Sequence, residues 1–302
     1  MKKGRDSILT RIGRLFQKIN PIFFRWVEVP FRKKQLNKYP IIFVVSAPRS
    51  GSTLTYQILT KGTKSLYLSN LSNLLYALPL IGGMLSKNKK SKGNFKSNKG
   101  WVNGLFGESE GMRFWEYWIG QSLEEPIINV PVSRISYLRK IFGRLITKGN
   151  PMICAYLGHA FSMSKLRKIF PGITFIYIKR DELSNVYSLF NIIKVRNWFS
   201  LKPLSWEDKI HLNSYERAVW QYNSIISCIE KDIQKEDTLV VNYEDICSDP
   251  HKFLNKVKSF VSDRGINLQL DLENIPESFI ISRTDKNKNK DTELLNKLIH
   301  DE

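Results

Sequence analysis

The stretch that most constrains this chain joins an apolar strand to a helix through a short polar turn. Residues 41–45 read IIFVV, which is typical of a strand buried on both faces of a parallel sheet. The letters SAPRSGST follow, and residues 53–61 have helical periodicity. Such a turn points consecutive backbone N–H groups outward, where the helix dipole adds positive charge. The sequence therefore predicts an anion-binding loop here.

The side chains of this loop favour the same function. Gly51 permits an unusual backbone angle or the close approach of a ligand. Ser50, Ser52 and Thr53 offer hydroxyl donors. Arg49 offers a forked, permanent charge that suits an oxyanion.

The loop differs from the loop that binds nucleoside triphosphates. Aligned on Gly51, the pattern G-x-x-x-x-G-K-[ST] requires glycine at Ser46 and lysine at Ser52. A kinase or NTPase uses that lysine, together with Mg²⁺, on the β- and γ-phosphates. A P-loop-type kinase or NTPase is therefore the alternative reading, and Mg²⁺-dependent ATP binding would favour it.

Strand-like and helix-like segments alternate along the rest of the chain. This alternation predicts an α/β fold, a single domain with a central parallel β-sheet flanked by helices. We expect a basic amphipathic segment at residues 1–39 and the domain at residues 40–302. The expected strands are residues 41–45, 152–157, 173–178 and 238–242, and the expected helices are 53–61, 160–170, one from about 183, 206–233 and 250–261.

A second anion-binding position is expected beside the first. Arg180 directly follows the strand ITFIYIK, and the carboxyl ends of parallel strands meet at one edge of a sheet. Ser188 comes eight residues later, about two helical turns along. Two oxyanion sites on one edge indicate a nucleotide with two separated phosphates.

Three stretches, in order, resemble the PAPS-dependent sulfotransferases, whose donor is 3′-phosphoadenosine 5′-phosphosulfate (PAPS). APRSGSTL resembles the 5′-phosphosulfate loop of the carbohydrate and bacterial branches. FPGITFIYIKRDELSNVYS resembles the segment that holds the 3′-phosphate, and VVNYEDICSDPHKFLNKVKSF resembles the YED segment. They span residues 41 to about 261. The resemblance implies a P-loop-NTPase-like fold and transfer of a sulfuryl group from PAPS to a hydroxyl or amine, without a metal.

The resemblance also implies roles for individual residues. Residues Arg49 to Thr53 bind the 5′-phosphosulfate, and Arg180 and Ser188 bind the 3′-phosphate. Tyr243 lies near the adenine.

Two further positions concern the same nucleotide. Arg283, with Lys286, belongs to a basic tail expected to close over the 3′-phosphate. Leu54 stands where cytosolic members carry an aromatic residue that stacks on adenine.

Two residues are candidates for the general base. His159 follows the strand expected at 152–157, and it lies 12 residues before Pro171, as does the histidine of the K-x-P-x-H stretch in related sulfotransferases. Glu110 lies among aromatic residues, where burial raises the pKa of a carboxylate. Several sulfotransferase branches use a glutamate. Arg49 is the third catalytic candidate, expected to stabilise charge on the leaving phosphate.

Composition leaves a third reading open. The net charge of +19 predicts attraction to polyanions, so a non-catalytic polyanion- or membrane-binding protein remains an alternative. We expect no specific nucleic-acid partner. The uncharged stretch 65–86, the aromatic residues of 101–118 and the amphipathic N-terminus indicate an acceptor that is a glycan or a lipid-linked sugar.

The cysteines bear on metal binding and compartment. Cys154, Cys228 and Cys247 are far apart and form no Cys/His cluster, so we expect neither a zinc site nor a disulfide framework. No secretory signal pattern is apparent. We expect a cytoplasmic protein that touches a membrane surface through its N-terminal helix.

Overall fold

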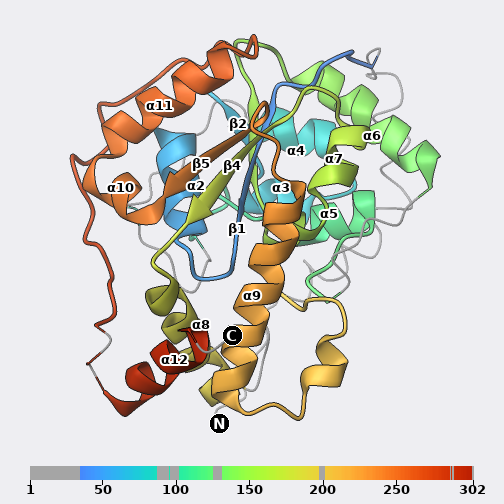
Figure 1. Ribbon diagram of the computed structural model, residues 1–302. Helices are drawn as coiled ribbons and strands as arrows, with labels where there is room; N and C mark the ends of the chain where they lie inside the picture. Colours follow the sequence, from blue (N-terminus) through green and yellow to red (C-terminus); the bar gives the residue numbers. More distant parts are fainter. Residues whose placement is uncertain are drawn as a thin grey trace.

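A five-stranded parallel sheet lies at the centre of the protein in the computed structural model (Figure 1). The structure describes residues 35–86, 95, 102–124, 131–196, 201–285, 287 and 289–300. The strand order is β2-β3-β1-β4-β5, and every neighbouring pair is parallel. The strands are β1 (Ile41–Ser46), β2 (Leu66–Tyr67), β3 (Met152–Ala155), β4 (Thr174–Lys179) and β5 (Thr238–Asn242).

Helices cover both faces of this sheet. The first layer packs on the face of the sheet to which Phe43 points, and it contributes the larger of the two apolar cores. The second layer packs on the opposite face, to which Val44 points. The first layer contains α5 (Met112–Ile119), α6 (Val132–Leu145), α7 (Met163–Ile169), α8 (Glu182–Arg196), α9 (Ser214–Asp232) and α12 (Lys290–His300). The second layer contains α2 (Ser52–Lys61), α10 (Tyr243–Ser248) and α11 (Pro250–Ser262). The short α3 (Asn70–Leu74) and α4 (Pro79–Ser86) follow β2.

The alternation of side chains along β1 explains this arrangement. All six residues of β1 are buried, because successive side chains point to opposite faces and both faces are covered. Ile41, Phe43 and Val45 enter one core, while Ile42 and Val44 enter the other. The expected α/β fold with a central parallel sheet is confirmed.

Some expected boundaries move. The strand expected at 152–157 ends at Ala155, because a 3-10 helix, Leu157–Phe161, begins two residues later. The helix expected at 160–170 covers only Met163–Ile169. The N-terminal segment lies outside the described residues up to position 34, and so does Lys286 of the basic tail.

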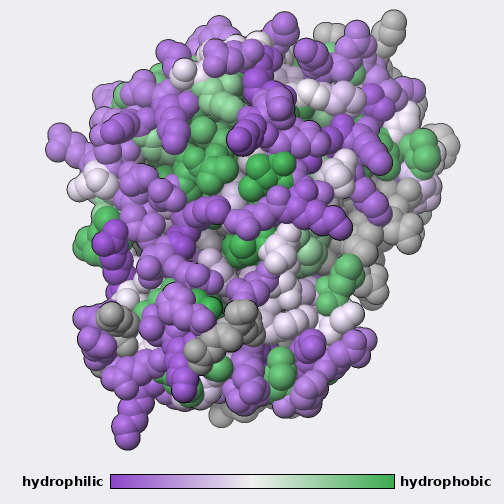
Figure 2. Space-filling model, in the orientation of Figure 1, coloured by the Kyte–Doolittle hydropathy of each residue, from purple (hydrophilic) through white to green (hydrophobic). Residues whose placement is uncertain are grey.

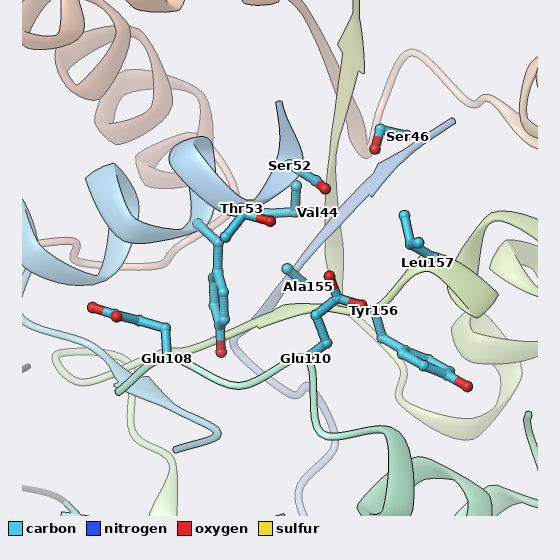
Figure 3. Close-up of a pocket in the computed structure, with 10 residues that line it drawn as sticks. Val44, Ser46, Ser52, Thr53, Glu108, Glu110, Ala155, Tyr156 and Leu157 are labelled. Carbon is cyan, nitrogen blue, oxygen red and sulfur yellow. The ribbon is translucent and has the colours of Figure 1, made fainter. Parts of the chain in front are cut away.

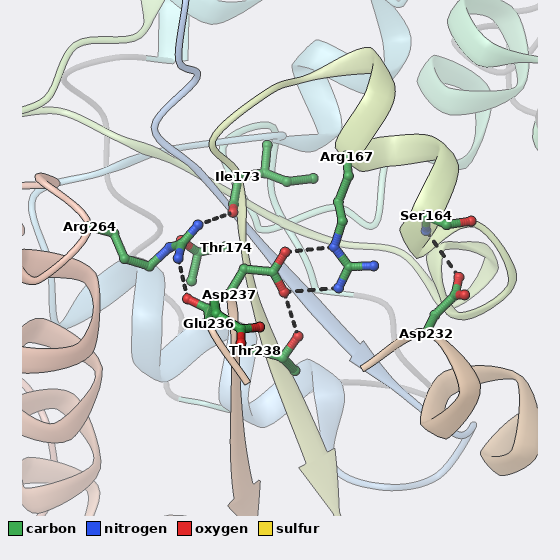
Figure 4. Close-up of polar contacts among 9 residues, drawn as sticks. All are labelled: Ser164, Arg167, Ile173, Thr174, Asp232, Glu236, Asp237, Thr238 and Arg264. Carbon is green, nitrogen blue, oxygen red and sulfur yellow. Dashed lines mark hydrogen bonds and ion pairs between the residues drawn. The ribbon is translucent and has the colours of Figure 1, made fainter. Parts of the chain in front are cut away.

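The amino-terminal edge of β4 and β5 is closed by ion pairs and hydrogen bonds (Figure 4). Arg167 of α7 holds Asp237 with two hydrogen bonds, of 2.6 and 2.9 Å. Arg264 donates to the Thr174 hydroxyl at 3.0 Å and to the backbone oxygens of Ile173 and Glu236. These contacts fix the ends of two strands and leave the carboxyl edge as the place for a ligand.

The face of the protein shown in Figure 2 is mostly hydrophilic, and its apolar side chains form small separate areas. Among the helices that the structure describes, none combines the length and the apolar character needed to cross a bilayer.

Candidate active site

The predicted loop occupies the carboxyl end of β1 and opens α2. Arg49 has φ 69° and Gly51 has φ 85°, so two of its residues are in the left-handed region. Such turns gather N–H groups into an anion-binding concavity. No side chain caps the start of α2, and its first turn contains no acidic residue. The helix therefore begins with its positive end open to a ligand.

Gly51 lies directly beneath an aromatic ring. A Cβ atom at this position would fall 2.2 Å from the Tyr243 ring, so no residue other than glycine fits without movement. On the Tyr243 ring lies the guanidinium of Arg180, 5.0 Å from the ring centroid. Gly51 follows β1, Arg180 follows β4 and Tyr243 follows β5. The carboxyl ends of these three strands therefore meet where the three residues stack on one another.

Arg180 joins this loop to the C-terminal part of the chain. Its Nη1 donates to the backbone oxygen of Arg49 at 2.5 Å, and its Nη2 donates to the backbone oxygen of Ser282 at 2.5 Å. Its Nε is buried and has no hydrogen-bond partner among the described residues. A buried donor without a partner is costly, and an incoming anion would satisfy it.

Arg49 and Ser188 bring the two predicted anion sites together. Arg49 Nε donates to Ser188 Oγ at 3.1 Å. Burial and the neighbouring charge of Arg180 lower the pKa of Arg49. Two guanidinium groups that repel each other in this way are stabilised by an anion placed between them.

An open cleft of about 680 Å³ lies against these residues. Its lining includes three arginines and one carboxylate, that of Glu110. The remaining wall is partly apolar and comes from α8 and from the region after β3. The lining residues are Pro48, Arg49, Gly51, Ser52, Thr53, Leu54, Glu110, Leu157, Arg180, Ser188, Asn191, Ile192, Val195, Arg196, Tyr243 and Ser282.

Glu110 reaches the cleft from the loop before α5. It also lines a small cavity of about 10 Å³, together with Ser52, Thr53 and Leu157. Figure 3 shows its carboxylate pointing toward the start of α2. Burial raises the pKa of Glu110 to about 7. A carboxylate with this pKa in a cleft that arginines also line is suited to accept a proton near neutral pH.

Comparison with known proteins identifies the family of this chain. Residues 40–262 match the profile of a group described as the sulfotransferase family. The chain belongs to the sulfotransferase family.

Solved structures of bacterial sulfotransferases share its fold. The sulfotransferase STF9 of Mycobacterium avium superposes with a TM-score of 0.52 at 14% identity, over 91% of this chain and 76% of that one. The sulfotransferase STF1 of Mycobacterium tuberculosis H37Rv gives a TM-score of 0.51 at 13% identity, over 98% of this chain and 86% of that one. A search of curated protein sequences gave no match.

His159 of this sulfotransferase lies in the core and does not line the cleft. Its side chain is 0% exposed, with ring centroids of Phe43 at 4.8 Å and Trp115 at 4.7 Å. Its Nδ1 hydrogen-bonds to Gln121 Oε1 at 2.8 Å. Burial lowers the pKa of His159 to about 3, so the ring stays neutral. The position of His159 after β3 predicted a place at the carboxyl edge of the sheet. The 3-10 helix instead turns its side chain into the core.

Other predicted residues divide between the cleft and its surroundings. Leu54 and Tyr243 line the cleft. Ser50 turns inward, where its hydroxyl accepts a 2.5 Å hydrogen bond from Asn185 of α8. Arg283 is exposed and lies outside the lining residues, although Ser282 is one of them.

Glu108, two residues before Glu110, has a different environment. It is buried and pairs with Lys61 at 3.3 Å, while Thr60 donates to it at 3.4 Å. Figure 3 shows its carboxylate directed away from that of Glu110. It therefore serves the packing of α2 in this sulfotransferase. No group of three or more potential metal ligands occurs in the part of the chain that is described.

Proposed function

We propose that this chain transfers a sulfuryl group from PAPS to a hydroxyl or amine of an acceptor. One observation carries the proposal: the loop at the end of β1, Arg180 with Ser188, and Glu110 all border a single cleft at the carboxyl edge of the sheet. A donor with two separated phosphates needs two cationic positions, and the acceptor needs a base beside one of them.

The described contacts fit such a donor. The open start of α2 and the hydroxyls of Ser52 and Thr53 suit the 5′-phosphosulfate. Ser188 and the unpartnered Nε of Arg180 suit the 3′-phosphate. Tyr243 and Leu54, which both line the cleft, offer apolar contacts for an adenine ring. We infer that Arg283 adds longer-range positive charge.

In the proposed reaction the acceptor oxygen bonds to sulfur as the bond from sulfur to the 5′-phosphate oxygen breaks. The electron pair of that bond stays on the phosphate, where the loop N–H groups and Arg49 stabilise the charge. Glu110 takes the acceptor proton, because it is the carboxylate that borders the cleft and its pKa is about 7. We assign the base to Glu110 rather than to His159, since His159 is closed off in the core.

For the acceptor we propose a glycan or a lipid-linked sugar. The cleft is wide, and Leu157, Ile192 and Val195 give it an apolar wall. Val195 is 81% exposed, so this wall continues to the surface. Activity on glycolipid acceptors and on small phenols should be compared, and a preference for phenols would refute this choice.

We further propose that the protein works in the cytoplasm and touches the membrane through residues 1–39. All three cysteines are unpaired, in keeping with a reducing compartment. Sedimentation with phosphatidylglycerol vesicles tests the contact, and the Phe16→Asp variant should lose it. Equal sedimentation of the two proteins would contradict the membrane contact.

The donor is tested by ligand-dependent stability. A specific ligand raises the melting temperature by mass action. Adenosine 3′,5′-bisphosphate should stabilise the protein more than ATP with Mg²⁺ or adenosine 5′-phosphosulfate does. No shift with the bisphosphate would overturn the proposal, and a larger shift with Mg²⁺-ATP would favour a kinase or NTPase.

A further inference from the structure

The cleft contains one arginine that the proposed donor leaves unused. Arg49 and Arg180 lie at the loop, where they contact each other and Ser188. Arg196 lines the same cleft from the last turn of α8. It is exposed and makes no hydrogen bond or ion pair with any other described residue.

The position of Arg196 separates it from the donor phosphates. It lies eight residues beyond Ser188 on one continuous helix, which places the two Cα atoms about 12 Å apart along the axis. Ile192 and Val195 lie between them on the same wall of the cleft. The charge is therefore at the far end of an apolar strip that begins beside the proposed 3′-phosphate site.

The end of a helix favours cations in general, but this does not explain the direction of Arg196. Lys194, in the same turn, faces away from the cleft and pairs with Asp291 at 3.2 Å. Arg196 instead borders a cleft whose lining includes one carboxylate, Glu110. A forked guanidinium in that position is suited to a planar or tetrahedral oxyanion.

We propose that Arg196 recognises an anionic group on the acceptor, so that this enzyme favours acceptors with a hydroxyl near Glu110, an apolar middle and a carboxylate, phosphate or sulfate at the outer end. The proposal rests on the proposed sulfotransferase function and narrows its acceptor class. A sugar joined through an alkyl chain to a carboxylate, phosphate or sulfate has this chemistry. Arg196 is a specificity-determining residue here and takes no part in the bond changes.

The test uses a matched pair of probes, octyl β-glucoside and 7-carboxyheptyl β-glucoside, which differ only in that a carboxylate replaces the terminal methyl group of the alkyl chain. Each is titrated by calorimetry into the full-length protein saturated with adenosine 3′,5′-bisphosphate. Wild type should bind the carboxylate-bearing glucoside about tenfold more tightly or better, as expected for one charge-assisted contact. Arg196→Gln should abolish that preference, and Arg196→Lys should retain part of it. Lys194→Gln removes an equal charge from the same turn and should keep the full preference.

Several results would overturn the proposal. They are equal binding of the two glycosides, binding of neither, or a preference that survives Arg196→Gln. Weaker binding of the bisphosphate by Arg196→Gln would assign this arginine to the donor instead. A wild type that does not bind the bisphosphate at all would reject the proposed function itself, which is a separate outcome from the loss of acceptor preference.

Discussion

Arg49 Nε and Ser188 Oγ are 3.1 Å apart, although 139 positions separate them in the chain. This hydrogen bond joins the loop after β1 to the middle of α8. It places a permanent charge between the region proposed for the 5′-phosphosulfate and the region proposed for the 3′-phosphate. A change at either residue should therefore affect both ends of the donor.

Arg180→Ala should weaken binding of adenosine 3′,5′-bisphosphate by about 10–100-fold, because it removes both a charge and a guanidinium fork. Arg180→Lys should recover only part of this loss, since an ammonium cannot reach the backbone oxygens of Arg49 and Ser282 together. Calorimetry measures both variants. Arg144→Ala, which removes an exposed charge at the end of α6, should bind as wild type does.

Gly51→Ala should lower the free energy of unfolding by about 1–3 kcal/mol and greatly reduce donor binding. The new methyl group would overlap the Tyr243 ring, and the φ of 85° disfavours any side chain. Denaturant unfolding measures the loss. Adding Tyr243→Ala should make Gly51→Ala less destabilising than it is alone, because the overlap disappears while the backbone strain remains. Simple addition of the two losses would contradict this explanation.

The raised pKa of Glu110 predicts how the transfer rate depends on pH. Its pKa of about 7 means that the carboxyl is protonated in acid and becomes a base as the pH rises. The transfer rate should rise about tenfold per pH unit below 7 and level off above it. Glu110→Gln should lose activity at every pH, and a rate profile without an inflection near 7 would count against Glu110 as the base.

The raised pKa of Glu110 also predicts how the free energy of unfolding depends on pH. Because its pKa is raised by folding, the folded state holds a proton that the unfolded state has lost between about pH 4.5 and 7. Glu110 therefore stabilises the fold less as the pH rises. Glu110→Gln should be more stable than wild type by about 1–3 kcal/mol at pH 8 and close to wild type at pH 5. Denaturant unfolding at the two pH values tests this difference.

His159→Phe separates packing from catalysis. It keeps an aromatic ring among Phe43 and Trp115 but loses the hydrogen bond to Gln121. We expect a loss of stability of about 1–2 kcal/mol and an unchanged pH profile of the remaining activity. A fall in rate of a hundredfold or more in folded protein would return His159 to the role of base.

The sequence predicted the fold well because its signals are local. The buried run of β1, the strand before Arg180 and the Asp249-Pro250 helix start each depend on neighbouring residues. The helices α6 and α12 were not predicted, because their apolar faces depend on partners that are distant in the chain. Tyr215 of α9, for example, anchors α12 through a 2.5 Å hydrogen bond to Asp291.

The candidate site was predictable only in part, for the same reason. The ends of two strands were expected at the carboxyl edge, which brought Arg49 and Arg180 into consideration, while Tyr243 came from the family resemblance. The direction of a side chain was not predictable. Ser50 and His159 face inward, while Ser282 and the outer end of α8 join the cleft through tertiary contacts that no motif marks.

The contact between Arg180 and Ser282 spans 102 positions of the chain. During synthesis the sheet, the loop and Arg180 are made before Ser282. The nascent chain therefore carries an anion site whose central guanidinium lacks one of its two backbone acceptors. Tight donor binding should therefore appear only once Ser282 has reached Arg180, so that this contact sets when the protein first becomes competent.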